Sequence, residues 1–340
     1  VNVQLYFING DPPLDAVTCD EDDDYPEGNS EDDECVEERA HPGWNWLDNE
    51  ITLTANQPTY WSALTGQPAN GGLSPFTALD PGSPPGRPDP EGSGERVLRG
   101  YIIGFAVNNE GEEIRWNHLA GNATIVNYSD GSAWEYNAWS FQAVNPMIGN
   151  GEKLGTPGTL SMDGMEYARS FGQLLLNFQA SGSSAFSGPS MVTSDTDLTL
   201  HPVSADLRQE TTGPVTTKAN FDIWNENEVK FSGLDRCITC WDQALLSTYE
   251  LPNHFLYENL QTDHGKARID GVASMLCDED LDGDGIPDIV SENAAILGVS
   301  AKMLVFDSSL KYAAAGSNLH GMGTEDAEIQ YDVLGPPPES

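Results

Sequence analysis

Positive charge is scarce in this sequence of 340 residues: 15 lysines and arginines stand against 54 aspartates and glutamates, a formal charge of −39. Nucleic-acid binding needs basic patches that neutralise phosphates, so DNA and RNA are excluded as partners, and anionic membrane surfaces are disfavoured for the same reason. Such a charge repels itself in a compact state unless cations or salt offset it. The acids are clustered, which favours focal cation binding over the alternative, the solvated surface of a halophilic protein.

Long apolar runs and catalytic motifs are also missing. No stretch of about eighteen apolar residues occurs, so no transmembrane segment is expected. The sequence contains no G-x-S-x-G elbow, Walker loop or H-E-x-x-H motif, and its six histidines are scattered without metal-ligand spacing. We therefore expect no enzyme, although 54 acids leave room for the facing carboxylate pair of a glycoside hydrolase.

Helical periodicity is rare, and only residues 240–248 and 290–297 are candidates for short helices. Runs rich in β-branched and aromatic residues alternate instead with Gly, Pro and Asn turns. The predicted strands cover residues 1–9, 51–55, 98–107, 123–128, 133–143, 171–179, 197–203, 220–231, 267–276, 299–306 and 328–334. Many short strands without a βαβ rhythm predict an all-β sandwich, jelly-roll-like or immunoglobulin-like.

One large domain is expected over residues 11–335, followed by a tail at 336–340. It contains an acidic loop at 19–35 and a Pro/Gly-rich surface loop at 70–97 with polyproline character. The chain begins with Val1 rather than Met, from which we expect that a signal peptide has been removed.

Residues 1–10 form an apolar strand that is set off from the domain by Pro12 and Pro13. Alternation places one set of side chains on one face of this strand: Val1, Val3, Leu5 and Phe7. Two interpretations stay open. The strand either pairs within its own sheet, or it is donated to the open sheet edge of a neighbouring copy and forms a homopolymer interface.

The most regular acidic stretch lies at residues 278–289, Asp-Glu-Asp-Leu-Asp-Gly-Asp-Gly-Ile-Pro-Asp-Ile. Ca²⁺ prefers six to eight oxygens at about 2.3–2.6 Å, and short carboxylates at alternate positions of a tight loop converge on one point. Gly285 permits the sharp turn. The predicted calcium ligands are Asp280, Asp282, Asp284, the Ile286 carbonyl and Asp288.

This loop departs from the common pattern at position 12, which is Ser291, so Glu292 is the expected source of the bidentate ligand. The form D-x-D-x-D-G-x-x-D resembles the calcium loops of thrombospondin type 3 repeats and dockerins. The resemblance covers about a dozen residues. It implies a calcium-stabilised extracellular protein and nothing about activity.

The acidic loop suggests a second cation site without a turn glycine, at Asp20, Asp22 and Asp24. An oxidising compartment makes disulfides the expected state of the five cysteines. We expect Cys19 to pair with Cys35 around the acidic loop and Cys237 to pair with Cys277, which leaves Cys240 over. A redox or haem role for Cys237-Ile-Thr-Cys240 is not favoured, because Trp241 follows and no βαβ context exists.

Two sequons, at Asn122 and Asn127, are candidate glycosylation sites in a strand-rich region. Several tryptophans are candidates either for stacking on sugar rings or for core positions: Trp44, Trp46, Trp134, Trp139 and Trp224. Asp263-His264 could polarise a nucleophile, but such a pair is more often simply part of a turn.

The segments 134–141 and 221–233 resemble parts of uncharacterised secreted bacterial surface proteins, which implies localisation only. Together with the terminal apolar strand, the chain is similar in outline to subunits of extracellular filaments built by strand donation. We therefore expect a secreted, calcium-binding, disulfide-bonded structural protein of the cell surface. The alternative is a calcium-stabilised carbohydrate-binding protein or glycoside hydrolase, which a pocket lined by two carboxylates and an exposed tryptophan would favour.

Removal of calcium tests the loop at 278–289. An ion that binds only the folded state stabilises it by about 2.7 kcal/mol at a free concentration one hundred times its Kd. Excess EGTA should therefore lower the melting temperature, and the Asp282→Asn variant should melt at the lower temperature with or without chelator. Identical melting curves with and without EGTA, with no metal found by elemental analysis, would contradict the prediction.

Overall fold

The computed structural model describes residues 1–9, 47–60, 87–88, 96–97, 100–127, 132–182, 192–208, 216–239, 241–273, 293–306 and 311–333. Within these ranges the chain is nearly all β, which confirms the predicted class. The exceptions are the α-helix α1 (Tyr257–Leu260) and the 3-10 turn η1 (Leu246–Thr248). No helix in these ranges has the length and apolar character needed to cross a membrane.

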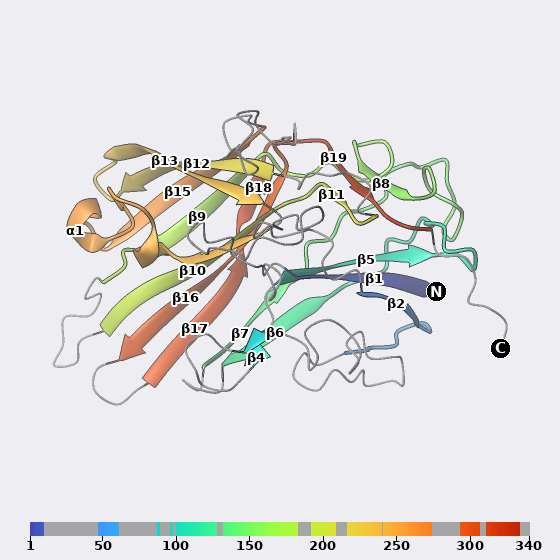
Figure 1. Cartoon of the computed structure of the whole chain (residues 1–340), viewed down its shortest axis with the longest axis horizontal. Helices are drawn as coiled ribbons and strands as arrows, with labels where there is room; N and C mark the ends of the chain where they lie inside the picture. Colours follow the sequence, from blue (N-terminus) through green and yellow to red (C-terminus); the bar gives the residue numbers. More distant parts are fainter. Residues whose placement is uncertain are drawn as a thin grey trace, which may run out of the picture.

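A five-stranded antiparallel sheet forms one layer of the main sandwich, in the order β13-β12-β15-β9-β18 (Figure 1). Its strands are β9 (Gln173–Gln179), β12 (Thr216–Asn225), β13 (Lys230–Thr239), β15 (His264–Val272) and β18 (His320–Met322).

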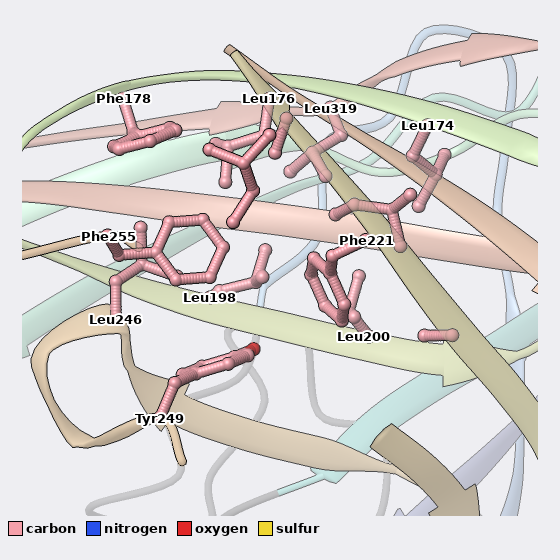
Figure 2. Packing of buried hydrophobic residues seen from close by; sticks show 14 of the residues in the cluster. Leu174, Leu176, Phe178, Leu198, Leu200, Phe221, Leu246, Tyr249, Phe255 and Leu319 are labelled. Carbon is pink, nitrogen blue, oxygen red and sulfur yellow. The ribbon is translucent and has the colours of Figure 1, made fainter. Parts of the chain in front are cut away.

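A four-stranded sheet in the order β14-β10-β16-β17 forms the facing layer. Its strands are β10 (Val192–Pro202), β14 (Asp242–Leu245), β16 (Ile296–Phe306) and β17 (Lys311–Asn318). The apolar faces of the two sheets enclose the larger core cluster of the described residues, which Figure 2 shows from close by.

Aromatic side chains fill one end of this core. Phe255 packs edge-on against Phe178, Phe221 and Tyr249, with ring centroids 5.0, 6.0 and 5.2 Å away. These contacts join β9 and β12 to the η1–α1 segment, so the loop that follows β14 closes the open end of the sandwich (Figure 2). Arg236 lies over the Tyr249 ring at 4.7 Å and donates two hydrogen bonds to Asp242.

A second core cluster lies between two three-stranded sheets, β2-β1-β5 and β11-β19-β8. Their strands are β1 (Asn2–Asn9), β2 (Leu47–Thr52), β5 (Gly100–Val107), β8 (Thr159–Met162), β11 (Ala205–Asp206) and β19 (Ala327–Gln330). Phe105 and Tyr331 meet across this cluster with ring centroids 4.6 Å apart.

The start of β16 joins the two clusters. Ile296 is buried in the larger cluster and Leu297 in the second one, because successive side chains of a strand point to opposite faces. Phe171 packs against both clusters, and its carbonyl accepts a hydrogen bond of 2.9 Å from the Ile296 N–H. One continuous strand therefore belongs to both packed units.

Two hairpins complete the described elements. The pair β6 (Asn122–Asn127) and β7 (Ser132–Asn137) lies beside β17, where a side chain at Gly316 would overlap the ring of Trp134. The pair β3 (Arg87–Pro88) and β4 (Arg96–Val97) falls within the segment predicted to be a Pro/Gly-rich loop.

In this single chain β1 lies in its own sheet, paired on one side with β2 and on the other with β5. This is the first of the two alternatives stated for the terminal strand. The side chains that enter the second cluster are Tyr6 and Ile8, on the face opposite to the predicted one. Val3 is also buried, and Leu5 lies across Gly104. Strand donation through Val1, Val3, Leu5 and Phe7 would require β1 to leave this sheet, and it stays a prediction.

Several sequence-based boundaries were wrong. Within the helix predicted at 240–248, residues 242–248 form β14 and η1, and the strand β16 begins at Ile296, inside the helix predicted at 290–297. The single strand predicted at 220–231 is a hairpin of β12 and β13. The sequence around the turn, Asn-Glu-Asn-Glu, lacks the glycine that marks a two-residue hairpin loop.

Deletion of residues 1–9 tests the position of β1. Burial of Tyr6 and Ile8 contributes about 3–6 kcal/mol, and their loss would also expose the hydrogen-bonding edges of β2 and β5. We expect the truncated protein to lose near-ultraviolet circular dichroism and to melt at a clearly lower temperature. Folded truncated monomers with an unchanged melting temperature would contradict this placement and would favour strand donation.

Candidate functional site

The outer face of the five-stranded sheet carries the side chains best placed to meet a ligand. Along β12, Phe221 and Ile223 point into the core, so Asp222 and Trp224 point outward. The turn after Trp224 is organised by Asn225, whose side-chain oxygen accepts hydrogen bonds of 3.0 Å from the N–H groups at positions 227 and 229. This Asx-type turn presents the next acidic side chains beside the sheet.

An open hollow of about 440 Å³ lies at this end of the sheet. We call it the Trp224 hollow. Its volume falls within the usual range for small-molecule sites, about 300–1,000 Å³. Its lining comes from β9, from the β12–β13 turn and from β15: Leu175, Trp224, Asn225, Glu226, Glu228, His264, Gly265, Lys266 and Arg268.

Strand register sets two lysines on either side of the indole. Trp224 is directly opposite Lys230 on β13 and directly opposite Lys266 on β15, so the three side chains form a row across three strands. The Lys230 ammonium lies 5.5 Å from the centre of the indole ring system, and the Arg268 guanidinium lies 5.9 Å from it. Both distances are in the cation–π range.

Asp222 holds two of these cations in place. It accepts contacts of 2.8 Å from Lys230 and 2.6 Å from Arg268, and Arg268 also donates to Asp270 at 2.9 Å. Lys266 is different, because it is exposed and forms no ion pair with any residue that the structure describes. The hollow therefore contains one uncommitted ammonium group beside a half-buried indole.

Acidic side chains also line the hollow. Glu226 and Glu228 are both exposed on the β12–β13 turn, and Glu226 lies 3.4 Å from Nδ1 of His264. Carboxylates accept hydrogen bonds, whereas Lys266 donates them. The hollow thus combines an apolar ring with hydrogen-bond donors and acceptors, an arrangement suited to a polar ligand with an apolar face.

A second cluster of acids combines the buried Glu113 with the half-buried Glu166. Glu113 is fully buried, the side chains of Tyr167 and Glu166 lie beside its carboxyl group, and burial raises its pKa to about 9. Glu113 is therefore protonated at neutral pH. Because it has no exposed surface, it meets no ligand.

Glu166 and two tyrosines surround this buried acid. Burial raises the pKa of Glu166, whose side chain accepts a hydrogen bond of 3.0 Å from the Ser161 N–H. Burial also raises the pKa of Tyr167, and it raises that of Tyr331 to about 12. Glu166 approaches Gly155 so closely that a side chain there would overlap its carboxylate. The cluster is packed, which fits a structural role.

Most of the predicted metal and disulfide residues lie outside the described residues, and those predictions stay untested: Asp20, Asp22, Asp24, Asp280, Asp282, Asp284, Ile286, Asp288, Glu292, Cys19, Cys35 and Cys277. Cys237 lies on β13 opposite Lys218. In the described ranges no three His, Cys, Asp or Glu side chains come together as metal ligands. The sequons lie on β6, with Asn122 exposed and Asn127 at the end of the strand.

The sequence identified part of the hollow. Trp224 was one of the tryptophans proposed for sugar stacking, and His264 belongs to the Asp-His pair. Lys266 and Arg268 were missed, because the strand predicted at 267–276 begins after Lys266, whereas β15 begins at His264 and places both side chains on one face. The pairing of Lys266 with Trp224 and of Arg268 with Asp222 depends on the register between β12 and β15, which cannot be read from the sequence. Nothing in the residues around Glu113 indicated its burial.

The pKa of Glu113 predicts how stability depends on pH. The folded-state pKa, about 9, lies above the ordinary value of 4.5. As the pH rises between these two values, the unfolded chain releases this proton while the folded chain retains it, so stability falls by up to about 1.4 kcal/mol per pH unit. Glu113→Gln should flatten this slope in urea unfolding, and the neighbouring Glu112→Gln should keep it. Equal slopes in the wild type and Glu113→Gln would contradict the buried position.

Comparisons with known proteins found no relative of this chain. No protein-family model matches the chain, and neither a curated protein nor a solved structure matches it. No family membership is therefore assigned. What the chain does has to be inferred from the chemistry of its own residues, among which those of the Trp224 hollow are best suited to bind a ligand.

Proposed function

We propose that this chain is an extracellular, calcium-stabilised β-sandwich protein that binds carbohydrate in the Trp224 hollow. The extracellular location and the binding of calcium are inferred from the sequence of residues 278–289 alone. Carbohydrate binding is inferred from the Trp224 hollow. The observation that carries the proposal is a half-buried indole flanked by hydrogen-bond donors and acceptors in one open hollow.

Sugar rings have the matching chemistry. A pyranose has one face of C–H groups, which packs on an aromatic ring, and a rim of hydroxyl groups that both donate and accept hydrogen bonds. In the hollow, hydroxyls can donate to Glu226 or Glu228 and accept from Lys266. The fixed partners of Lys230 and Arg268 keep the indole in one orientation, which lowers the entropic cost of binding.

Binding rather than hydrolysis is proposed, because glycoside hydrolysis needs two carboxyl groups that flank the scissile bond. Glu226 and Glu228 belong to the same turn on one rim of the hollow. Of the two acids whose pKa values burial raises, Glu113 and Glu166, Glu113 has no exposed surface and cannot reach a glycosidic bond. Neither pair has the arrangement that hydrolysis needs.

The structural role expected from the sequence becomes the second candidate. Its most specific form, a filament assembled by strand donation, depended on a terminal strand outside its own sheet. β1 lies between β2 and β5 in this chain. The features that still favour a surface protein are the acidic composition and the predicted calcium loop, and both are compatible with carbohydrate binding.

An oligosaccharide array followed by calorimetry tests the proposal. We expect the wild type to bind at least one glycan and Trp224→Ala to bind it about tenfold more weakly, since loss of aromatic stacking costs on the order of 1–1.5 kcal/mol. Trp224→Phe should retain most of the affinity. Trp116→Ala is the control, because Trp116 is also partly exposed but lies outside the five-stranded sheet.

Two results would contradict carbohydrate binding in the hollow. One is the absence of binding to any glycan on the array by calcium-loaded, folded protein. The other is a glycan that Trp224→Ala binds as tightly as the wild type does, which would place the carbohydrate site elsewhere.

A further inference from the structure

The geometry of the Trp224 hollow points to an acidic glycan as its ligand, one whose sugar carboxylate is bound by Lys266; this inference rests on the proposed function. The supporting observation is an imbalance among the cations of the outer sheet face. Four of the chain's 15 basic residues point outward from this sheet: Lys218, Lys230, Lys266 and Arg268.

Three of these four cations have acidic partners. Lys218 lies 2.7 Å from Asp235, Lys230 lies 2.8 Å from Asp222, and Arg268 contacts both Asp222 and Asp270. Lys266 has no acidic partner among the residues that the structure describes. In a chain of charge −39, a lysine beside an aromatic ring that pairs with none of the described acids is suited to an anionic ligand.

The position of Lys266 suits a sugar carboxylate. Directly opposite residues of an antiparallel pair have Cβ atoms about 4.5–5.5 Å apart, and Lys266 is directly opposite Trp224. A pyranose ring that stacks on Trp224 therefore brings a carboxylate on its edge within reach of the flexible Lys266 ammonium. A charge-assisted contact of this kind is stronger than one to a hydroxyl group.

The rim acids fix the direction of the ligand. Glu226 and Glu228 would repel an anion placed over the β12–β13 turn, and Glu226 also lies 3.4 Å from His264 at the start of β15, so the carboxylate has to lie beside Lys266. The neutral hydroxyls then face the turn. A neutral glycan would leave Lys266 without a charged partner.

Titration with tetragalacturonate and with its carboxyl-reduced form, at one fixed salt and calcium concentration, tests the inference. The two probes share ring number and linkage and differ in charge. The wild type should bind the acidic form more tightly, and Lys266→Gln should reduce that preference about three- to tenfold while binding the reduced form unchanged. Lys218→Gln, on the same sheet face but outside the hollow, should keep the wild-type preference.

The outcomes separate the two proposals. If the wild type binds both forms equally, or if Lys266→Gln keeps the full preference for the acidic form, the acidic-glycan inference is overturned while carbohydrate binding stands. If neither form binds while another glycan on the array does, the hollow binds a different sugar and this inference is also overturned. If no glycan binds at all, the proposed function fails and the inference fails with it.

Discussion

The apolar contact between the five-stranded and four-stranded sheets is the interaction on which the rest of the structure depends. Leu198 and Leu200 from one sheet meet Phe221 and Ile223 from the other, all nearly without exposed surface. Each such side chain stabilises the fold by about 1.5–3 kcal/mol. A shift of β12 by one residue would move its whole apolar set to solvent, so this core fixes the register of β12.

The outer face of the sheet follows from that register. With Phe221 and Ile223 committed to the core, Trp224 must face outward, and β13 and β15 must place Lys230 and Lys266 opposite it. The pairing that builds the core therefore also assembles the Trp224 hollow. A site on paired strands is held more rigidly than one on a loop, which favours a preorganised binding surface.

Charge gives this face its distinct character. The chain carries 54 acids, and their mutual repulsion opposes a compact fold. On the outer sheet face, Asp222, Asp235 and Asp270 are each matched to a lysine or an arginine. The face is thereby close to neutral, so an anionic ligand that approaches it meets less repulsion than the overall charge of the chain would predict.

The sequence predicted the all-β class because β-branched and aromatic runs recur between turn residues, and most predicted strands lie within a few residues of observed ones. The sequence predicted strand faces and boundaries less well where the local residue preference disagrees with the strand pairing in the fold. Alternation grouped Val1, Val3, Leu5 and Phe7 on one face of β1 but did not indicate that Tyr6 and Ile8 on the other face enter the second core cluster, because the facing sheet decides this. Trp224 could be named from the sequence, but its neighbours could not, because cross-strand contacts depend on register between segments far apart in the chain.

A crystal structure of the chain with a bound oligosaccharide tests the central claim most directly. We predict that a pyranose ring stacks on Trp224 in the hollow, that its hydroxyl groups face Glu226 and Glu228, and that its charged substituent contacts Lys266. A sugar bound at another surface, with the Trp224 hollow unchanged from the free protein, would contradict the account.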